Sequence, residues 1–300
     1  MVNDSRLKLT GLIGYPVKYS LSPAIHNAAF EVLGLNLRYV VFPVQREALE
    51  EAVKGMAALG FAGFNVTIPY KEAVIPFLDS IHPEAEQIGA VNTVVISNGK
   101  LLGYNTDGVG FIRALEERDI RAAEKNVLLL GAGGAAKAVA VALARRGAAS
   151  IAIAVRNLDR GKKLAGKLAG LGVQTRVVHL EALVDPREVL WHTNGAGEEK
   201  AVPAPPDIII NATPVGMTPE RETELIRVDS LPPHCIVCDL VYGPRRTLLL
   251  QKSAAAGHKV IDGSGMLLHQ GAEAFFLFTG VQAPLEVMRR AMDVALCNNM

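Results

Sequence analysis

The chain has 300 residues, of which half are hydrophobic and a fifth are charged. This length suits one large domain or two ordinary ones, and the composition is sufficient for a sizeable buried core. Positive and negative charges nearly cancel, at a net +1, and basic residues are not concentrated in any block, which argues against a nucleic-acid partner.

The first third of the chain alternates predicted strands and helices. The predicted strands are apolar runs rich in β-branched or aromatic residues: 8–14, 38–44 and 61–67. The predicted helices cover 22–34 and 46–60. Ser22 is the expected N-cap of the first helix, with Pro23 at its first helical position and Gly34 at its end.

A β-hairpin follows, because Asn98-Gly99 stands between the apolar runs AVNTVVIS and KLLGYNTD. A helix over 109–117 then leads to a second strand–helix–strand pattern within 125–157. Further strands are expected in IIINAT, CIVCDLVY and HKVIDG, and two helices are expected at the C-terminus. This alternation predicts two α/β domains with mainly parallel sheets, meeting near 107–110.

The N-terminal stretch has charges where a signal peptide needs an apolar centre, and no apolar run approaches the roughly 18 residues of a membrane span. We therefore expect a cytoplasmic protein without a membrane partner. Three cysteines fit a reducing compartment. Cys235 and Cys238 form a CxxC, but no second ligand pair accompanies them. This predicts two buried thiols on a strand and no metal site.

The segment Gly131-Ala-Gly133-Gly134-Ala-Ala136 follows an apolar strand and opens an amphipathic helix. In that context the G-x-G-x-x-G/A pattern predicts dinucleotide binding. The first glycine permits the tight turn, the second lets the backbone approach a pyrophosphate, and Ala136 permits close helix–strand packing. The alternative is a tight strand–helix turn that binds no ligand.

The next predicted strand ends at Val155, about where a NAD-binding chain would place an acidic residue on the ribose hydroxyls. Here Arg156 follows, with Arg160 four residues later. Arginine matches phosphate geometry with paired N–H donors, so this pattern predicts a 2′-phosphate and hence NADP as the cofactor. Asp159 is the one nearby acid, and a place in the first turn of a helix explains it through the helix dipole.

Polar residues gather at the strand and loop ends of the first third. They are Ser20 with Ser22; Asn65, Thr67 and Lys71; Asn92; and Asn105, Thr106 and Asp107. Each group alone has a structural explanation as a helix cap or a turn. Together they predict a site for a small, polyhydroxylated, anionic molecule next to a nicotinamide.

Seven ordered motifs resemble shikimate dehydrogenase: SLSP, NVTIPYK, IGAVNTV, GYNTDG, GAGGAAKA, NATPVGM and DGSGMLLHQGAEAF. The resemblance covers about 9–280. It implies NADPH-dependent, reversible reduction of 3-dehydroshikimate to shikimate, on the route to chorismate and the aromatic amino acids. It also implies two α/β domains with a cleft between them: a substrate-binding domain over 1–108 plus 265–300, and a Rossmann-type NADP-binding domain over 109–264.

The resemblance further implies roles for individual residues. Lys71 and Asp107 would be the catalytic pair. The residues implied in substrate binding are Ser20, Ser22, Asn65, Thr67, Lys71, Asn92, Asp107, Tyr242 and Gln270. Those implied in NADP binding are Gly131, Ala132, Gly133, Gly134, Ala135, Arg156, Asn157, Arg160, Thr213, Leu240 and Gly263.

Two positions depart from the family pattern. Val155-Arg156-Asn157 stands where Asn-Arg-Thr is common, and Ser264 stands where an apolar residue is common. The chemistry of Lys71 also has two interpretations. It either transfers the proton of the reacting hydroxyl or only orients that oxygen by hydrogen bonding, and the sequence leaves both open.

Other functions compete with this interpretation. A quinate dehydrogenase, or a dual quinate/shikimate dehydrogenase, would prefer NAD, which Arg156 and Arg160 argue against. A non-catalytic metabolite or NADP(H) sensor would be expected to lack Lys71 or Asp107, and both are present. A dehydrogenase for a cyclic folate shares the two-domain organisation, but the motifs SLSP and NATPVGM are not expected in it. The sequence does not fix the oligomeric state, for which a homodimer is one candidate.

Overall fold

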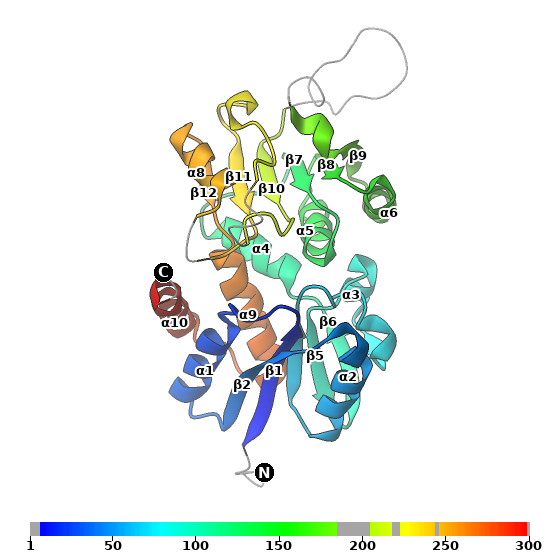
Figure 1. Cartoon of the computed structure of the whole chain (residues 1–300), viewed down its shortest axis with the longest axis vertical. Helices are drawn as coiled ribbons and strands as arrows, with labels where there is room; N and C mark the ends of the chain where they lie inside the picture. The colour runs from blue at the N-terminus through cyan, green and yellow to red at the C-terminus, as the bar shows by residue number, and fades with distance from the viewer. Residues whose placement is uncertain (1–6, 185–204, 218–222, 244–245, 299–300) are drawn as a thin grey trace. The chain divides into compact units, whose positions relative to one another are not determined.

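The computed structural model of the chain describes residues 7–184, 205–217, 223–243 and 246–298. It divides into two compact units (Figure 1). Unit 1 comprises Met1–Gly110 and Leu267–Met300, and unit 2 comprises Phe111–Met266. The C-terminal segment therefore returns to the unit that contains the N-terminus.

Unit 1 is built on a mixed six-stranded sheet with the order β2-β1-β3-β5-β6-β4. Its strands are β1 (Lys8–Gly14), β2 (Leu37–Pro43), β3 (Gly63–Val66), β4 (Ser80–Ile81), β5 (Thr93–Ser97) and β6 (Lys100–Tyr104). β5 is antiparallel to both of its neighbours, whereas the other pairings are parallel. The amino end of β5 therefore lies at the same sheet edge as the carboxyl ends of β1, β3 and β6.

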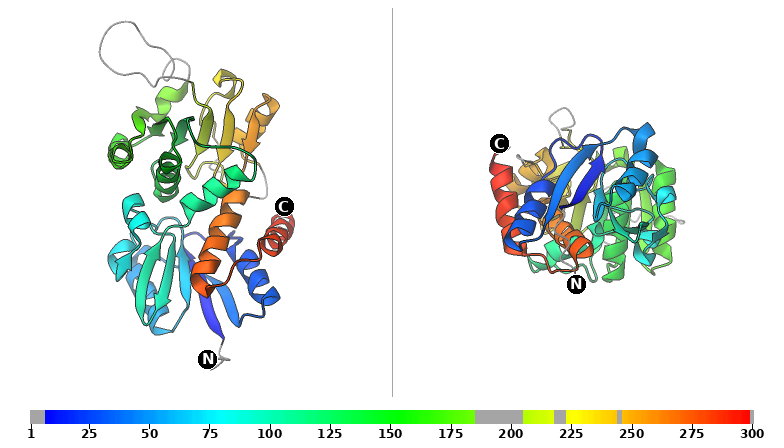
Figure 2. Two further views of the ribbon diagram at one scale, coloured as in Figure 1. Left: turned by 180° about the vertical axis from the view of Figure 1, so that it is seen from behind. Right: turned by 90° about the horizontal axis from the view of Figure 1, so that it is seen from below.

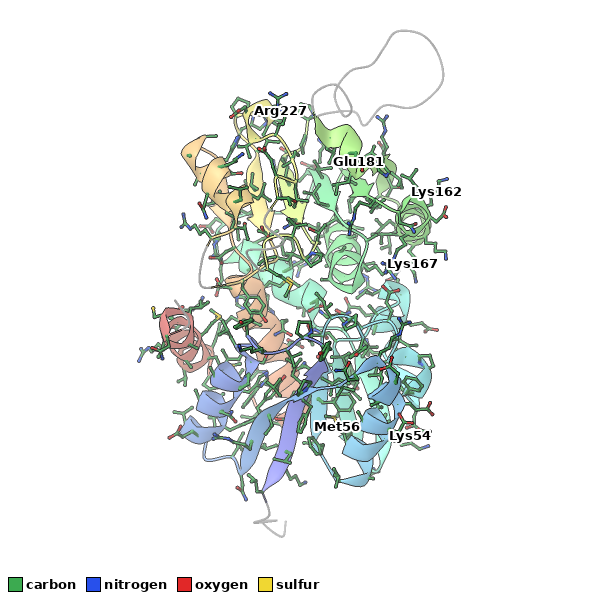
Figure 3. The ribbon with its side chains drawn as sticks, in the orientation of Figure 1. Lys54, Met56, Lys162, Lys167, Glu181 and Arg227 are labelled. Atoms are coloured by element: carbon green, nitrogen blue, oxygen red, sulfur yellow. The ribbon has the colours of Figure 1, made fainter. Side chains whose placement is uncertain are left out.

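Helices cover both faces of this sheet. They are α1 (Ser22–Val32), α2 (Leu49–Ala58), α3 (Pro83–Ile88), α9 (Ser264–Thr279) and α10 (Leu285–Asn298). Met56 of α2 packs with Phe64 in one core cluster, while Lys54 is exposed on the other side of the same helix (Figure 3). On the opposite face, α9 approaches Gly63, where an added Cβ would lie 2.6 Å from the ring of Phe278 (Figure 2).

Unit 2 contains a fully parallel six-stranded sheet with the order β12-β11-β10-β7-β8-β9. Its strands are β7 (Asn126–Leu130), β8 (Ser150–Val155), β9 (Gln174–His179), β10 (Ile208–Asn211), β11 (Ile236–Asp239) and β12 (Lys259–Ile261). The strand order reverses between β7 and β10. This is the topological switch point at which open α/β sheets bind ligands, beyond the carboxyl ends of the strands.

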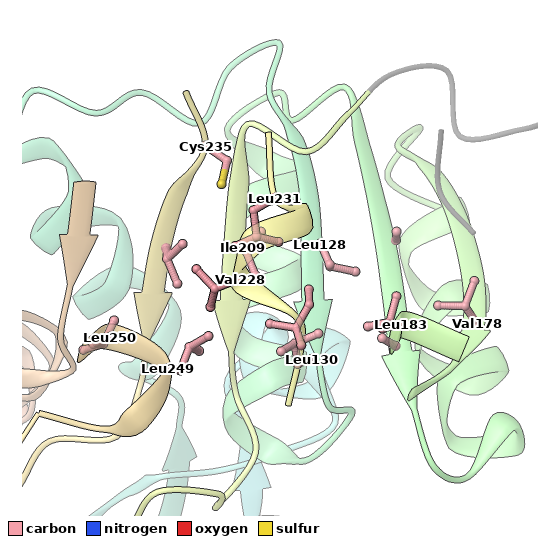
Figure 4. Close-up of a cluster of buried hydrophobic side chains, with 14 residues drawn as sticks. Leu128, Leu130, Val178, Leu183, Ile209, Val228, Leu231, Cys235, Leu249 and Leu250 are labelled. Atoms are coloured by element: carbon pink, nitrogen blue, oxygen red, sulfur yellow. The ribbon is translucent and has the colours of Figure 1, made fainter. Parts of the chain in front are cut away.

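The helices of this region are α4 (Asp107–Glu116), α5 (Gly134–Arg145), α6 (Leu158–Ala169) and α8 (Leu248–Ala255). Leu128 and Leu130 of β7 pack with Ile209 of β10 and Leu249 of α8 in one apolar cluster (Figure 4). Strands that are buried on both faces read as continuous apolar runs, which explains why NVLLL and SIAIAV are so clear in the sequence.

The structure confirms the hairpin, since Asn98 and Gly99 both have positive φ, at 50° and 74°.

The structure corrects the predicted first residues of two helices. Leu21, and not Ser22, is the N-cap of α1, and Ser22 is the first helical residue. The hydroxyl of Ser20 accepts the Ser22 N–H at 3.3 Å, so the terminal donor is satisfied from outside the helix. α4 begins at Asp107, two residues before the predicted start, because Asn105 Oδ1 accepts the Asp107 N–H at 3.0 Å. The elements β4, β9, α3 and α8 were not predicted from the sequence.

His26 of α1 is completely buried in unit 1 and stacks on Tyr39, with ring centroids 4.4 Å apart and an interplanar angle of 7°. Within the described part of the chain, neither of its ring nitrogens has a hydrogen-bond partner. Because a charged imidazole is costly in such a site, burial lowers the pKa of His26 from 6.5 to about 3.

This burial predicts acid sensitivity. Below pH 6.5 the unfolded chain protonates His26 while the folded chain keeps it neutral down to pH about 3, so stability falls as the pH decreases through that range. The slope contributed by one such group approaches about 1.4 kcal/mol per pH unit. Urea unfolding at pH 7, 6 and 5 should show a shallower decline for His26→Leu than for the wild type. His234→Gln, at an exposed histidine, is the control and should keep the wild-type slope.

Candidate active site

The predicted catalytic and substrate residues of unit 1 follow or precede strands at one sheet edge. Ser20 follows β1, and Lys71 follows β3. Asn92 directly precedes β5, and Asp107 comes three residues after β6. The antiparallel direction of β5 is what brings Asn92 to this edge, since a parallel strand would place its amino end at the opposite one.

Lys71 and Asp107 form an ion pair, with Nζ 2.6 Å from Oδ2. The side chains are 15% and 4% exposed, respectively. Asp107 is the first residue of α4, where the positive end of the helix dipole stabilises a carboxylate. The pair thus places a lysine amino group at a half-buried position, held by a carboxylate that is itself fixed by the fold.

Asn92 connects this pair to Thr106 and to Gln270 of α9. Its Nδ2 donates to Asp107 Oδ1 and to Thr106 Oγ1, both at 2.9 Å, and lies 3.4 Å from Gln270 Oε1. Its Oδ1 accepts the Thr106 backbone N–H at 2.8 Å. Gln270 reaches this cluster from α9, 178 residues away in the sequence. The structure therefore brings together four of the predicted residues: Lys71, Asn92, Asp107 and Gln270.

The remaining predicted substrate residues are placed differently. Ser20 and Ser22 are adjacent through the hydrogen bond described above, at the start of α1. Thr67 is half-buried just beyond β3. Asn65 is buried within β3 and donates both of its amide hydrogens inside unit 1. Tyr242 belongs to unit 2 and is half-buried.

Two buried polar residues of unit 1 were not predicted from the sequence as site components: Tyr39 and Thr93. Tyr39 donates to Asn65 Oδ1 at 2.7 Å, and Thr93 donates to Asn92 Oδ1 at 2.9 Å. Thr93 could have been noticed because it follows Asn92 directly in the quoted motif. No local signal in the sequence marks Tyr39, which lies in an ordinary apolar strand.

The glycine loop of unit 2 has the geometry that the sequence predicted. Gly131 follows β7 with a φ of +108°, which strongly favours glycine, and an added Cβ would lie 3.1 Å from the carbonyl oxygen of Ala212. Gly133 is the N-cap of α5, and an added Cβ there would meet nothing within 4 Å. Ala136 is fully buried where α5 packs on the sheet. The open space at Gly133, in front of a helix N-terminus, fits a bound pyrophosphate.

Arg156, Asn157 and Arg160 lie on the exposed surface beyond β8. Asn157 caps α6, because its Oδ1 accepts the Arg160 backbone N–H at 3.1 Å. Gly161 lets α6 approach the sheet closely, since an added Cβ would lie 2.6 Å from Val177. Lys162 and Lys167 extend from the same helix (Figure 3). The cap and the close packing thus fix the backbone that carries both arginines.

The strand ends next to the switch point carry a second buried network. Asp239, at the end of β11, accepts from Asn211 Nδ2 at 2.9 Å, from Thr247 Oγ1 at 2.7 Å and from the Val241 N–H at 3.0 Å. Burial raises the pKa of the Asp239 carboxyl above its ordinary value. Asn211 Oδ1 in turn accepts from the Thr213 hydroxyl at 2.7 Å. The network fixes the loop that carries Thr213.

Leu240 and Gly263 lie beyond β11 and β12. An added Cβ at Gly263 would lie 2.3 Å from the carbonyl oxygen of Leu240, so glycine is required for these two segments to lie together. Ser264, one of the two departures from the family pattern, donates to Asp262 Oδ1 at 2.5 Å. The same Asp262 oxygen accepts the Ser264 backbone N–H at 3.1 Å, so the Asp262 carboxylate caps the turn that begins α9. The added hydroxyl bond gives the departure a local structural role.

The two thiols of the CxxC are buried directly before and within β11. Cys235 and Cys238 are free and buried, and burial raises the pKa of both thiols to about 12. Among the described residues, no group of three or more potential side-chain ligands could hold a metal ion.

In the part of the chain covered by the structure, no helix is long and apolar enough to cross a bilayer.

Comparison with known proteins assigns the chain to a family. Residues 12–94 match the shikimate dehydrogenase substrate binding domain, 114–196 match shikimate/quinate 5-dehydrogenase, and 263–292 match the shikimate 5′-dehydrogenase C-terminal domain. The NADP(+) shikimate dehydrogenase of Methanopyrus kandleri is 48% identical over 294 residues, which cover 96% of each chain. The chain belongs to the shikimate dehydrogenase family.

Solved structures show the same fold. Shikimate 5-dehydrogenase from Thermus thermophilus, in complex with NADP(H) and shikimate, matches with a TM-score of 0.80 and 36% identity, covering 96% of this chain and 99% of that one. Quinate dehydrogenase from Corynebacterium glutamicum, in complex with NAD, matches with a TM-score of 0.82 and 34% identity, at the same coverage. The two α/β domains and the Rossmann-type sheet are thereby confirmed.

The contrast between two glycines tests the cofactor loop. Gly133→Ala fits its backbone, with φ −80°, and meets no neighbour, so it should leave stability unchanged. Its methyl group enters the space in front of the α5 N-terminus, and we expect the Kd for NADPH to rise by about 10-fold or more, because the phosphates lose close backbone N–H contact.

Gly131→Ala is the matched comparison. Its φ of +108° strains any other residue, so this variant should lose stability as well as affinity. Fluorescence titration with NADPH and urea unfolding separate the two effects. Wild-type NADPH affinity in Gly133→Ala would contradict the assignment of the pyrophosphate to this loop.

Proposed function

We propose that this chain catalyses the NADPH-dependent, reversible reduction of 3-dehydroshikimate to shikimate, in the shikimate pathway of aromatic amino acid biosynthesis. It is an NADP-dependent oxidoreductase that acts on a secondary alcohol. The observation that carries the proposal is the Lys71–Asp107 ion pair, 2.6 Å long and hydrogen-bonded to Asn92 at a sheet edge lined with polar groups.

The reaction moves a hydride and a proton. NADPH supplies the hydride when it is bound. In the direction of reduction, the protonated Lys71 ammonium donates its proton to the carbonyl oxygen of the substrate, and in the direction of oxidation the neutral amine accepts it. Asp107 holds the Lys71 Nζ in place at 2.6 Å, so it orients the donor before the reaction begins.

Substrate recognition is assigned to the other polar groups of unit 1. Thr67, Asn92 and Gln270 offer hydroxyl and amide groups to the substrate hydroxyls. Ser20 and Ser22, at the N-terminal end of α1, bind the substrate carboxylate through hydroxyl donors and the positive end of the helix dipole. Tyr242 of unit 2 is assigned to the same carboxylate by family resemblance.

Cofactor binding is assigned to unit 2. The loop from Gly131 to Ala135 binds the pyrophosphate, and Arg156 and Arg160 bind the 2′-phosphate with paired guanidinium donors. Asn157 supports Arg160 through the α6 cap. Thr213, Leu240 and Gly263 line the nicotinamide end, at the carboxyl ends of β10, β11 and β12.

The domain division follows these assignments, with a substrate-binding domain over 1–108 plus 265–300 and an NADP-binding domain over 109–264. We also propose a cytoplasmic location, which the free thiols of all three cysteines support. A homodimer is the assembly we propose in solution, and light scattering of the purified protein measures it directly.

Removal of the Lys71 amine tests the proton-transfer role. Lys71→Ala should lower kcat by roughly 10²-fold or more, as expected for a general acid–base group, with a smaller change in the KM for shikimate. Lys54→Ala removes a lysine that pairs with Glu50 on the exposed side of α2, and it serves as the control with wild-type kinetics. Equal turnover by Lys71→Ala and the wild type would exclude Lys71 from catalysis.

Cofactor and substrate preferences are tested together. Initial rates with shikimate and quinate, each with NADP and NAD, should show the highest kcat/KM for shikimate with NADP. Arg156→Gln combined with Arg160→Gln should raise the KM for NADP by about 10-fold or more and change the KM for NAD little, because only NADP carries the 2′-phosphate. A preference for quinate with NAD would instead assign the chain to quinate oxidation, and NADPH binding without turnover of either acid would indicate a sensor.

A further inference from the structure

We propose that Tyr39 and Thr93 are positioning residues for the Lys71–Asp107 pair. They act through a chain of hydrogen bonds that runs from Tyr39 through Asn65, Thr93 and Asn92 to the carboxylate of Asp107. Every donor in this chain is oriented toward Asp107. The inference rests on the proposed function, because it assigns a role in a reaction for which that pair is catalytic.

The direction of the chain is set at its Asp107 end. Asn92 Oδ1 faces the backbone N–H of Thr106 at 2.8 Å, and an N–H group can only donate. The amide of Asn92 therefore has only one orientation, in which Nδ2 donates to Asp107 Oδ1 at 2.9 Å. Thr93 Oγ1 lies 2.9 Å from the same Asn92 Oδ1, so the hydroxyl of Thr93 must donate to it.

The remaining links follow from these. Since Thr93 uses its single proton on Asn92, it accepts from Asn65, whose Nδ2 lies 2.9 Å away. The second N–H of Asn65 donates to the backbone oxygen of Asn92 at 3.1 Å, which confirms the same orientation of the Asn65 amide. Asn65 Oδ1 then faces the Tyr39 hydroxyl at 2.7 Å, and Tyr39 must be the donor.

Tyr39 is held firmly at the far end of the chain. The order β2-β1-β3 means that its side chain reaches past β1 to meet Asn65 on β3. Its ring is stacked on His26, and both its backbone N–H and its carbonyl are bonded to the side chain of Asn27, at 2.8 and 3.1 Å. The phenol oxygen is consequently a fixed donor.

The hydrogen-bond chain is buried, which makes the loss of any one of its links costly. Tyr39, Asn65, Asn92 and Thr93 are all buried, with exposed fractions between 0% and 6%. In such surroundings each hydrogen bond polarises the next, and the loss of one partner leaves a buried polar group that water cannot satisfy. A chain in which all donors face the same way therefore favours one arrangement of Asn92 and of the carboxylate that Asn92 holds.

These hydrogen bonds also revise the role predicted for Asn65. Both of its amide hydrogens are used inside unit 1, so it has none to donate to a substrate hydroxyl. We therefore assign Asn65 to positioning.

The experiment uses five variants of the full chain. Thr93→Val removes the central hydroxyl, and Thr93→Ser retains it. Tyr39→Phe removes the first donor, alone and combined with Thr93→Val. Tyr70→Phe is the matched control, because Tyr70 is another buried tyrosine of unit 1 whose hydroxyl donates to the backbone oxygen of Val44 at 2.7 Å, outside the chain. For each variant, kcat, the KM values for shikimate and NADP, and the urea midpoint of unfolding are measured.

We expect kcat to fall by about 10-fold in Thr93→Val and about 3-fold in Tyr39→Phe, because each variant removes a buried hydroxyl from the hydrogen bonds that lead to Asp107. The KM for NADP should stay unchanged, because the residues assigned to NADP binding are not altered. Thr93→Ser should recover kcat to within about 2-fold of the wild type, since it restores the hydroxyl. The double variant should be no slower than Thr93→Val, because both changes interrupt one chain. Tyr70→Phe should lower the urea midpoint without lowering kcat.

Two outcomes would overturn the proposal. Wild-type kcat in Thr93→Val and Tyr39→Phe, with lowered urea midpoints, would show that the chain only stabilises the fold. Fully multiplicative losses of kcat in the double variant would show that the two residues act separately. A wild-type protein that does not turn over shikimate would overturn the proposed function instead. The double-mutant cycle in the urea midpoint would then still decide whether Tyr39 and Thr93 belong to one coupled chain.

Discussion

The ion pair between Lys71 and Asp107 is the contact on which the organisation of unit 1 depends. Its two members come from different segments, one following β3 and the other opening α4. They meet because β6 is parallel to β3, so that both strands end at the same edge of the sheet. A lysine in this place would otherwise be an ordinary surface charge. With a buried carboxylate at 2.6 Å, its amino group is instead held in one place.

A buried carboxylate imposes requirements on its surroundings, because each polar group removed from water needs a partner. The Asp107 carboxylate has Lys71 and Asn92 as partners, and Asn92 in turn requires Thr106 and Thr93. The polar cluster of unit 1 thus extends from the catalytic edge into the sheet. Several buried polar residues of this unit therefore support a single charged pair.

The glycine loop of unit 2 has a geometry suited to binding a phosphate. A phosphate needs backbone N–H groups and open space, and the loop at Gly131 and Gly133 provides both at the switch point of a parallel sheet. We propose that selectivity for a 2′-phosphate is added beyond the neighbouring strand, by Arg156 directly after β8 and by Arg160 on α6, the helix that Asn157 caps. The fold provides the general binding mode, and a few exposed side chains specify the cofactor.

The sequence by itself determined the features that depend on local patterns. Apolar runs defined the strands of unit 2 other than β9, Asn98-Gly99 defined the hairpin, and the glycine spacing at Gly131 defined the dinucleotide loop, because each is encoded within about a dozen neighbouring residues. The motifs also brought Lys71 and Asp107 to attention. Local patterns failed at the start of α1, where Ser20 rather than Ser22 satisfies the free donor, and at the short elements β4 and α3.

Only the tertiary structure decided which polar residues meet and in which direction they donate. The partnership of Tyr39 with Asn65 spans 26 residues and crosses an intervening strand, and that of Asn92 with Gln270 spans 178. No local pattern encodes such contacts, because they depend on strand order and on the antiparallel direction of β5. The direction of each hydrogen bond was fixed in turn by a backbone N–H and a carboxylate, whose positions are set by packing.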